Sequence, residues 1–468
     1  MKPFPALTTR ELPEAPRWTK AIGVGVVALG LAIGTGELIL WPTLVVKFGP
    51  NILWGAFIGL TLQLFINYEV ARHTLATGES FFTSSARLFK WFAPFWLVAA
   101  FFLYIWPGWA SALGTILNAL MGFGNPVLWA WATLILVLLM TLVGRQAYHT
   151  LEVSMKIIVP AFFILLLFVS FNNLSLNDVA QGVKGLFSIG WIPAGIDVSL
   201  FFSAIVFAGT GGMLNLCVSL WYRDKQVGMA AYSSPIKNPL TSQEQTQDVS
   251  GHTFEAKGQN LAHWKKWLSY VRGEQVIIFW LLGLITLFLL SINAYAVLAP
   301  RGIVPEGADV AIAQAAIFGE TWGDVGVKAF LIMAFLMLFS VMWTIINAFT
   351  RIISDVIFVN SHVGPLQRMF SKFKNISQSK LYYLLVVLLV IIQAALVPFS
   401  QPLPYLVLTS VLGGMVMAIY VPVILVLNNR HLAQSLRPKL FSNFILVIAA
   451  LTYTVFSIIV LLSLFGVM

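Results

Sequence analysis

The chain has 468 residues, of which 59% are hydrophobic and only 10% are charged, whereas a water-soluble domain carries roughly 25% charged residues. Together with a mean hydropathy of +0.87, this composition excludes a soluble globular protein. The net charge of +10 would fit a nucleic-acid-binding protein, but in a membrane protein the positions of the charges matter more than their sum, and we expect no nucleic-acid partner.

The chain begins with a polar, proline-rich stretch, the expected cytoplasmic N-terminal segment 1–19. The apolar stretch from Ala21 to Val46 is longer than the core of a signal peptide, so it is expected to remain as the first membrane span. Further apolar runs of about 20 residues, each long enough to cross the bilayer as a helix, recur along the sequence. We therefore predict an all-α integral membrane protein with eleven transmembrane helices, at 20–47, 50–73, 91–119, 126–143, 152–171, 195–221, 273–297, 326–350, 381–400, 404–428 and 441–466.

The distribution of basic residues predicts the orientation of these spans. With the N-terminus in the cytoplasm, all but four of the 28 Lys and Arg residues fall on the cytoplasmic side, and the exceptions are Lys47, Lys184, Arg301 and Lys328. Because cytoplasmic segments are enriched in Lys and Arg, we expect a cytoplasmic N-terminus, an outer C-terminus and residence in the cell (plasma or inner) membrane. The lipid bilayer is then the first partner of the chain.

A long polar segment, 223–272, joins the sixth and seventh spans on the cytoplasmic side. Its richness in Gln, Ser and Lys is typical of a flexible tether, and a regulatory or docking segment is the alternative. We divide the chain into five-helix units at 20–171 and 195–428, the second including this segment, followed by an eleventh helix in 441–468.

Spans one and six share a short motif near their middle. Span one contains Gly34-Thr35-Gly36, and span six contains Gly209-Thr210 followed by a further pair of glycines. Glycine is a poor helix former and accepts unusual backbone angles. Glycine-interrupted spans at matching positions in two halves are typical of a transporter with a binding site at the membrane midplane. Close helix packing through small residues is the alternative.

Glu37, directly after the first motif, is the only acidic residue placed near the centre of a span. A carboxylate at that depth is costly and is by default a functional candidate. It could bind a metal ion or carry a proton; the alternative is a neutral Glu37 hydrogen-bonded to the broken backbone of span six. Asn215, one turn beyond the second motif, could offer an amide oxygen or simply join helices. All six His residues map to cytoplasmic loops or inner helix ends, which disfavours a central His-based metal site.

At these residues the sequence resembles the Nramp (natural resistance-associated macrophage protein) family of divalent-metal transporters, as a divergent branch. The resemblance rests on the eleven spans, on the breaks in spans one and six, and on the span-two stretch Leu62-Gln63 through Ala71-Arg72 to Ala76-Thr77-Gly78. It implies a LeuT-like fold, in which spans 1–5 and 6–10 form an inverted repeat.

The sequence departs from this family in the metal site. The family's Asp-Pro-Gly-Asn aligns with residues 34–37, so the metal-binding Asp is missing and Glu37 stands at the Asn position. The family's Met-Pro-His-Asn aligns with residues 212–215, so Gly212 replaces the Met ligand unless the register slips by one onto Met213. Carboxylate, hydroxyl, carbonyl and amide oxygens suit a hard cation better than a soft transition metal.

We expect a secondary active transporter that moves a divalent metal cation by alternating access, with coupling to protons left open. Glu37, Thr35 and Asn215 are the expected metal ligands, and Glu37 is also the candidate proton carrier. The remaining candidate binding residues belong to the two breaks: Gly34, Gly36, Gly209, Thr210, Gly212 and Met213.

The same fold could instead carry an amino acid or another small organic solute, with backbone amides at the breaks binding a carboxylate and Glu37 binding an amine. A membrane enzyme would normally show clustered His or Asp residues near one interface. The sequence has no such cluster, so we expect neither enzymatic activity nor a cofactor. A channel is the other alternative class, and single-channel currents would reveal it.

Overall fold

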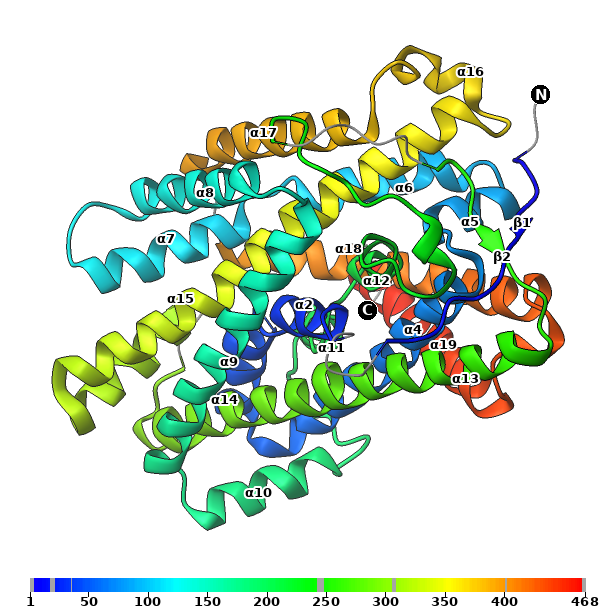
Figure 1. Cartoon of the computed structure of the whole chain (residues 1–468). Coiled ribbons are helices and arrows are strands. Elements are labelled where there is room, and N and C mark those ends of the chain that lie inside the picture. The colour runs from blue at the N-terminus through cyan, green and yellow to red at the C-terminus, as the bar shows by residue number, and fades with distance from the viewer. Residues whose placement is uncertain are drawn as a thin grey trace.

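The computed structural model describes residues 4–16, 22–34, 36–241, 248–304, 309–399 and 402–464. It is a bundle of helices, most of which run in roughly one direction across Figure 1. The first half contains α2 (Val24–Ala32), α3 (Trp41–Phe48), α4 (Trp54–Thr77), α5 (Phe81–Leu88), α6 (Phe92–Tyr104), α7 (Gly108–Met121), α8 (Pro126–Val143), α9 (Ala147–Asn173) and α10 (Leu176–Leu186). The second half contains α11 (Val198–Val206), α12 (Leu214–Asp224), α13 (Gly258–Gly273), α14 (Gly283–Leu298), α15 (Asp309–His362), α16 (Gln367–Phe370), α17 (Gln378–Leu396), α18 (Pro402–Val426) and α19 (Leu440–Leu464).

Ten helical segments of the described residues are long and apolar enough to cross a membrane. They correspond to ten of the predicted spans. The sixth predicted span, 195–221, is divided into α11 and α12, each too short to cross alone. The all-α membrane fold is thus as predicted, and the sixth span is interrupted where the glycines lie.

Helix ends coincide with residues suited to them. The carboxylate of Asp197 accepts the N–H groups of Ser199 and Leu200 at 2.8 and 3.1 Å, and so satisfies two free donors at the start of α11. Gly78 ends α4 with a φ of +64°, a left-handed conformation that glycine adopts without strain. Asp197 therefore marks the start of the first half of span six, and Gly78 marks the turn after span two.

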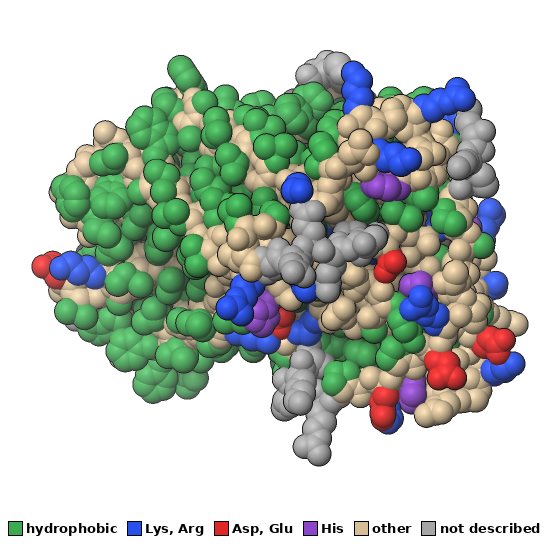
Figure 2. Space-filling view, turned by 45° about the horizontal axis from the view of Figure 1, so that its top comes forward, with side chains coloured by type: hydrophobic (Ala, Val, Ile, Leu, Met, Phe, Trp, Pro, Cys, Tyr) green, Lys and Arg blue, Asp and Glu red, His purple; other side chains and the backbone are tan. Residues whose placement is uncertain are grey.

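Positive charge gathers at one end of the bundle. In Figure 2, hydrophobic side chains cover most of the left half of the visible face, while most Lys and Arg side chains lie in the right half. We call this the basic end, defined by Arg72, Arg223, Lys265, Arg351 and Arg437.

The polar segment 223–272 differs from the flexible tether expected first. Its last part is helix α13, which continues without interruption through a π-helical stretch, η4 (Glu274–Leu282), into α14. Strand β2 (His252–Thr253) pairs in parallel with β1 (Thr8–Thr9) of the N-terminal segment. Polar composition could not predict this order, because it arises from contact between two segments far apart in the sequence.

Candidate functional site

The first span is broken between α2 and α3. The α-helix ends at Ala32, and a π-helical stretch, η1 (Gly36–Leu40), carries the chain into α3. Thr35 lies outside the described residues. A β-carbon on Gly36 would stand only 1.8 Å from the carbonyl oxygen of Phe207. Only glycine therefore permits this contact, which joins the break in span one to the break in span six.

The sixth span is broken between Val206 and Leu214. Gly211 and Gly212 have φ angles of +63° and +54°, conformations that glycine tolerates far better than other residues. Both predicted interruptions are therefore present, and they touch.

Gln63 of α4 bridges the break in span six. Its side-chain oxygen accepts the N–H of Gly211 at 2.7 Å, and its side-chain nitrogen donates to the carbonyl of Val206 at 2.9 Å. Buried backbone groups freed by an unwound helix need such partners. In the sequence, Gln63 contributes to the family resemblance without a stated partner. A glutamine in the middle of an apolar span was the signal for this role, but its partner could not be read from the sequence.

Glu37 is completely buried in η1. Its Oε2 atom accepts the N–H of Gly34 at 3.0 Å. Its other oxygen, Oε1, makes no hydrogen bond within the described part of the chain. Glu37 thus bonds to the break in its own span rather than to the backbone of span six, and it keeps one buried oxygen available to a ligand or a proton.

A small cavity lies where the two breaks meet. Gly36, Phe207, Gly209 and Thr210 contribute to its wall, together with apolar side chains of α2, α7, α12 and α15. Its volume is about 10 Å³, about the room that one water molecule needs. The structure therefore brings three of the predicted site residues, Gly36, Gly209 and Thr210, around one small space.

Asn215 lies in a polar cluster in the first turn of α12, directly after the break in span six. Its amide nitrogen donates to Thr210 Oγ1 at 2.5 Å and to Asn67 Oδ1 at 2.9 Å. Its amide oxygen accepts the hydroxyl of Tyr420 at 3.2 Å. Asn215 therefore joins α4, α12 and α18, and the hydroxyl of Tyr420 uses one of the two lone pairs of its amide oxygen.

Gly212 and Met213 do not contribute to the wall of the small cavity. Gly212 packs against α18: a β-carbon there would stand 3.1 Å from the Cα of Gly413, and its carbonyl accepts the hydroxyl of Tyr420 at 2.9 Å. The side chain of Met213 is fully buried. Gly34 also lies outside the wall, and a β-carbon on it would clash with Val341. The thioether of Met213 is thus separate from the small cavity between the breaks.

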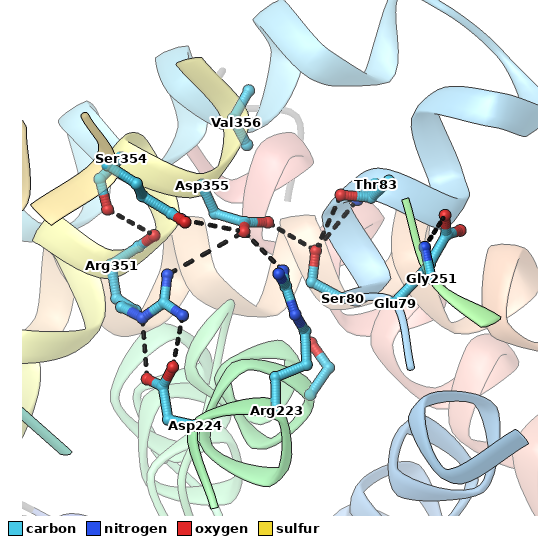
Figure 3. Close-up of polar contacts among 12 residues, drawn as sticks. Glu79, Ser80, Thr83, Arg223, Asp224, Gly251, Arg351, Ser354, Asp355 and Val356 are labelled. Carbon is cyan, nitrogen blue, oxygen red and sulfur yellow. Dashed lines mark hydrogen bonds and ion pairs between the residues drawn. The ribbon is translucent and has the colours of Figure 1, made fainter. Parts of the chain in front are cut away.

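Two buried ion pairs hold helices together at the basic end. Arg351 of α15 makes a two-bond contact with Asp224 of α12, at 2.6 and 2.8 Å. Arg223 donates to Asp355 at 2.7 Å, and Ser80 of α5 donates to the same carboxylate at 2.6 Å (Figure 3). Arg351 and Asp355, four residues apart in α15, are in longer contact, at 4.0 Å. These bonds tie α12 to α15 and α5.

The start of the first span is held at the same end. Lys225 donates to the carbonyl of Ile22 at 2.9 Å and pairs with Glu152 of α9 at 2.5 Å. The N–H of Gly23 donates to Glu274 at 2.5 Å. The residues just before α2 are therefore linked by hydrogen bonds and an ion pair to spans five, six and seven.

A larger cavity, of about 590 Å³, lies toward the opposite end. Its wall includes Leu40 at the end of η1, Lys47 of α3, Asp197 at the start of α11, and residues of α18. Leu40 belongs to the same short element as Glu37. The larger cavity is separate from the small one between the breaks, because no residue contributes to both walls.

Metal-binding side chains are sparse. Within the described ranges, no three His, Cys, Asp or Glu residues come close enough together to hold a metal ion. Glu37 is the one carboxylate in the broken stretches of spans one and six, and it does not contribute to the wall of the small cavity.

Comparison with known proteins identifies the fold. No protein-family model and no curated protein matches the sequence. A mutant of the Eremococcus coleocola manganese transporter is similar in structure, with 12% identity, a TM-score of 0.66, and coverage of 98% of this chain and 90% of that one. MhsT in complex with L-phenylalanine has 18% identity and a TM-score of 0.57, covering 97% and 99%. Mhp1, a nucleobase-cation-symport-1 family transporter, has 13% identity and a TM-score of 0.54, covering 94% and 93%. The chain thus has the predicted LeuT-like fold.

Proposed function

We propose that this protein is an Nramp-related secondary transporter that moves a hard divalent metal cation through the bilayer. The observation that carries the proposal is the arrangement of Glu37: a buried carboxylate with one unbonded oxygen, in a span whose break touches the break in span six. The similarity in structure to a manganese transporter supports the same cargo class.

The donor atoms near the breaks favour a hard ion. Glu37 would supply the carboxylate, the backbone around Gly34 and Gly209 would supply carbonyl oxygens, and Thr210 would supply a hydroxyl. Such oxygen sets suit Mg²⁺, Ca²⁺ or Mn²⁺. Met213 is the one soft donor considered, and it stands against several oxygen donors, so we favour a hard ion over a soft one.

The size of the small cavity favours an ion over an organic solute as the cargo. Its volume of about 10 Å³ has room for about one water molecule, whereas pockets for organic ligands usually measure roughly 300–1,000 Å³. An amino acid is the second candidate, because MhsT, which has a similar structure, was solved with L-phenylalanine. It would require the breaks to move apart first.

In alternating access, the open end of the molecule would close and the closed end would open. The fastened basic end and the wider cavity opposite it correspond to a state closed toward the cytoplasm. Opening the basic end would require the pairs of Arg223 and Arg351 to separate. Glu37 would bind the ion in one state and take up a proton in the other, which would couple the two fluxes.

Binding to the purified protein tests this proposal directly. Titration calorimetry with Mn²⁺, Mg²⁺ and Ca²⁺ should show binding to the wild type, and Glu37→Gln should weaken it by tenfold or more, on the order of the 1.4 kcal/mol expected from losing one charged ligand. Equal affinity in the two proteins would contradict the role of Glu37. Binding of L-phenylalanine but of no metal would favour the second candidate.

A further inference from the structure

A separate cavity of about 390 Å³ opens at the basic end, away from the two breaks. Its wall is formed by α4, by the junction of α13 and η4, and by the residues that lead into α19. One side is apolar, with Leu64 and Phe65 of α4 and Phe441 of α19, and Phe441 is 64% exposed. The cavity is therefore a groove at the basic end with one apolar side.

The rim of this groove is strongly basic. Lys265, Arg272, Arg437 and Lys439 all belong to it, and none of the four pairs with a carboxylate in the described part of the chain. The more deeply buried cations at this end, Arg72, Arg223 and Arg351, are by contrast paired with Asp or Glu. Four uncompensated positive charges thus surround one opening.

Parts of the rim are held in place by neighbouring groups. Arg272 donates to the hydroxyl of Tyr68 at 3.3 Å and lies 5.7 Å from the centre of its ring. Arg437 donates to the carbonyl of Leu432 at 3.0 Å. A fifth cation, Arg72, is neutralised by Glu69 at 2.8 Å. Two of the four uncompensated cations are therefore oriented before any ligand arrives.

We propose that this groove binds an anionic phospholipid from the cytoplasmic leaflet. The phosphate contacts Lys265, Arg272, Arg437 and Lys439, and an acyl chain lies along Leu64, Phe65 and Phe441. Basic pockets between membrane helices on the cytoplasmic side attract such headgroups. A soluble anion would use the rim and leave the apolar wall bare, and a zwitterionic lipid would use the wall and gain little from the rim.

The test compares lipids that share acyl chains. Affinities of the full-length purified protein are measured for phosphatidylglycerol and phosphatidylcholine, with inorganic phosphate as the soluble arm. We expect phosphatidylglycerol to bind at least tenfold more tightly than either. The Lys265→Gln/Lys439→Gln double variant should lose roughly 30-fold in affinity for phosphatidylglycerol, since each cation near a membrane surface contributes about fivefold.

The matched control is Lys372→Gln/Lys374→Gln, which removes two exposed positive charges from the same end outside the groove. It should leave the affinity unchanged. Equal losses in the two double variants, or equal affinity for the two lipids, would overturn the proposal, and so would phosphate binding as tightly as phosphatidylglycerol. Because both lysines are exposed, the variants should fold, and the single changes Lys265→Gln and Lys439→Gln give a graded series. No part of this test depends on transport.

Discussion

Gly36 and Phe207 are in direct backbone contact, so that a β-carbon at position 36 would stand 1.8 Å from the carbonyl oxygen of residue 207. This contact joins the broken parts of two spans that are far apart in the sequence. Both residues also belong to the wall of the small cavity.

Gly36→Ala should therefore destabilise the protein by roughly 1–3 kcal/mol, as overpacking of a close contact does, and should abolish ion binding. Gly283→Ala is the matched control, because a β-carbon there meets its neighbours at an ordinary 3.5 Å or more and alanine favours the helix. Thermal unfolding and Mn²⁺ titration check both variants. An unchanged midpoint for Gly36→Ala would show that the breaks do not touch.

Gln63→Leu should leave the N–H of Gly211 and the carbonyl of Val206 without their present partner. Leaving buried polar groups unpaired costs about 1–3 kcal/mol each, so we expect a lower unfolding midpoint and weaker ion binding. Asn429→Leu, which removes an amide from a pair with Asn443 at the basic end, should leave ion binding intact. Equal ion affinity in Gln63→Leu and the wild type would contradict the bridging role.

Asp224→Asn should loosen the basic end, because breaking a buried ion pair costs about 3–5 kcal/mol and leaves Arg351 unneutralised. Cys217, the single cysteine of the chain, reports on this opening, since it is fully buried in α12. Labelling by a thiol reagent added from the cytoplasmic side should become at least about tenfold faster in the variant, a shift of about 1.4 kcal/mol.

The charge-swapped double variant Asp224→Arg/Arg351→Asp should slow the labelling again, and Cys217→Ser gives the background. Labelling of Asp224→Asn at the wild-type rate would show that this pair does not hold the basic end closed.

The contact of the N-terminal segment with β2 should depend on pH. Burial, followed by the nearby charge of Arg10, lowers the pKa of His252, while Asp248 and Glu79 oppose the shift. The docked state therefore favours neutral His252, so docking is strongest above the usual His pKa of about 6.5 and weakens as the pH falls through the lowered pKa. Protease cleavage within residues 4–16 should increase between about pH 7.5 and pH 5. His252→Gln should remove the increase, and an identical pH dependence in that variant would contradict this role.

The sequence allowed the membrane fold and both interruptions to be predicted, because apolar length and glycine clusters are local signals. Glu37 stood out for the same reason, as a charge in an apolar run. The hydrogen-bond and ion-pair partners of buried side chains could not be predicted from such local signals. Gln63 bridges the sixth span, and Arg351 bonds mainly to Asp224 rather than to Asp355, since each pairing depends on how distant helices pack.

Transport itself tests the central claim most directly. Uptake of Mn²⁺, Mg²⁺ and Ca²⁺ into proteoliposomes is measured with and without an inward proton gradient, for the wild type and Glu37→Gln. We predict uptake of at least one of these ions by the wild type, a change in the rate of uptake when the gradient is imposed because ion and proton use the same carboxylate, and loss of uptake in Glu37→Gln with folding retained. A well-folded wild type that moves none of the three ions, or a Glu37→Gln variant that transports at the wild-type rate, would contradict a cation transporter centred on Glu37.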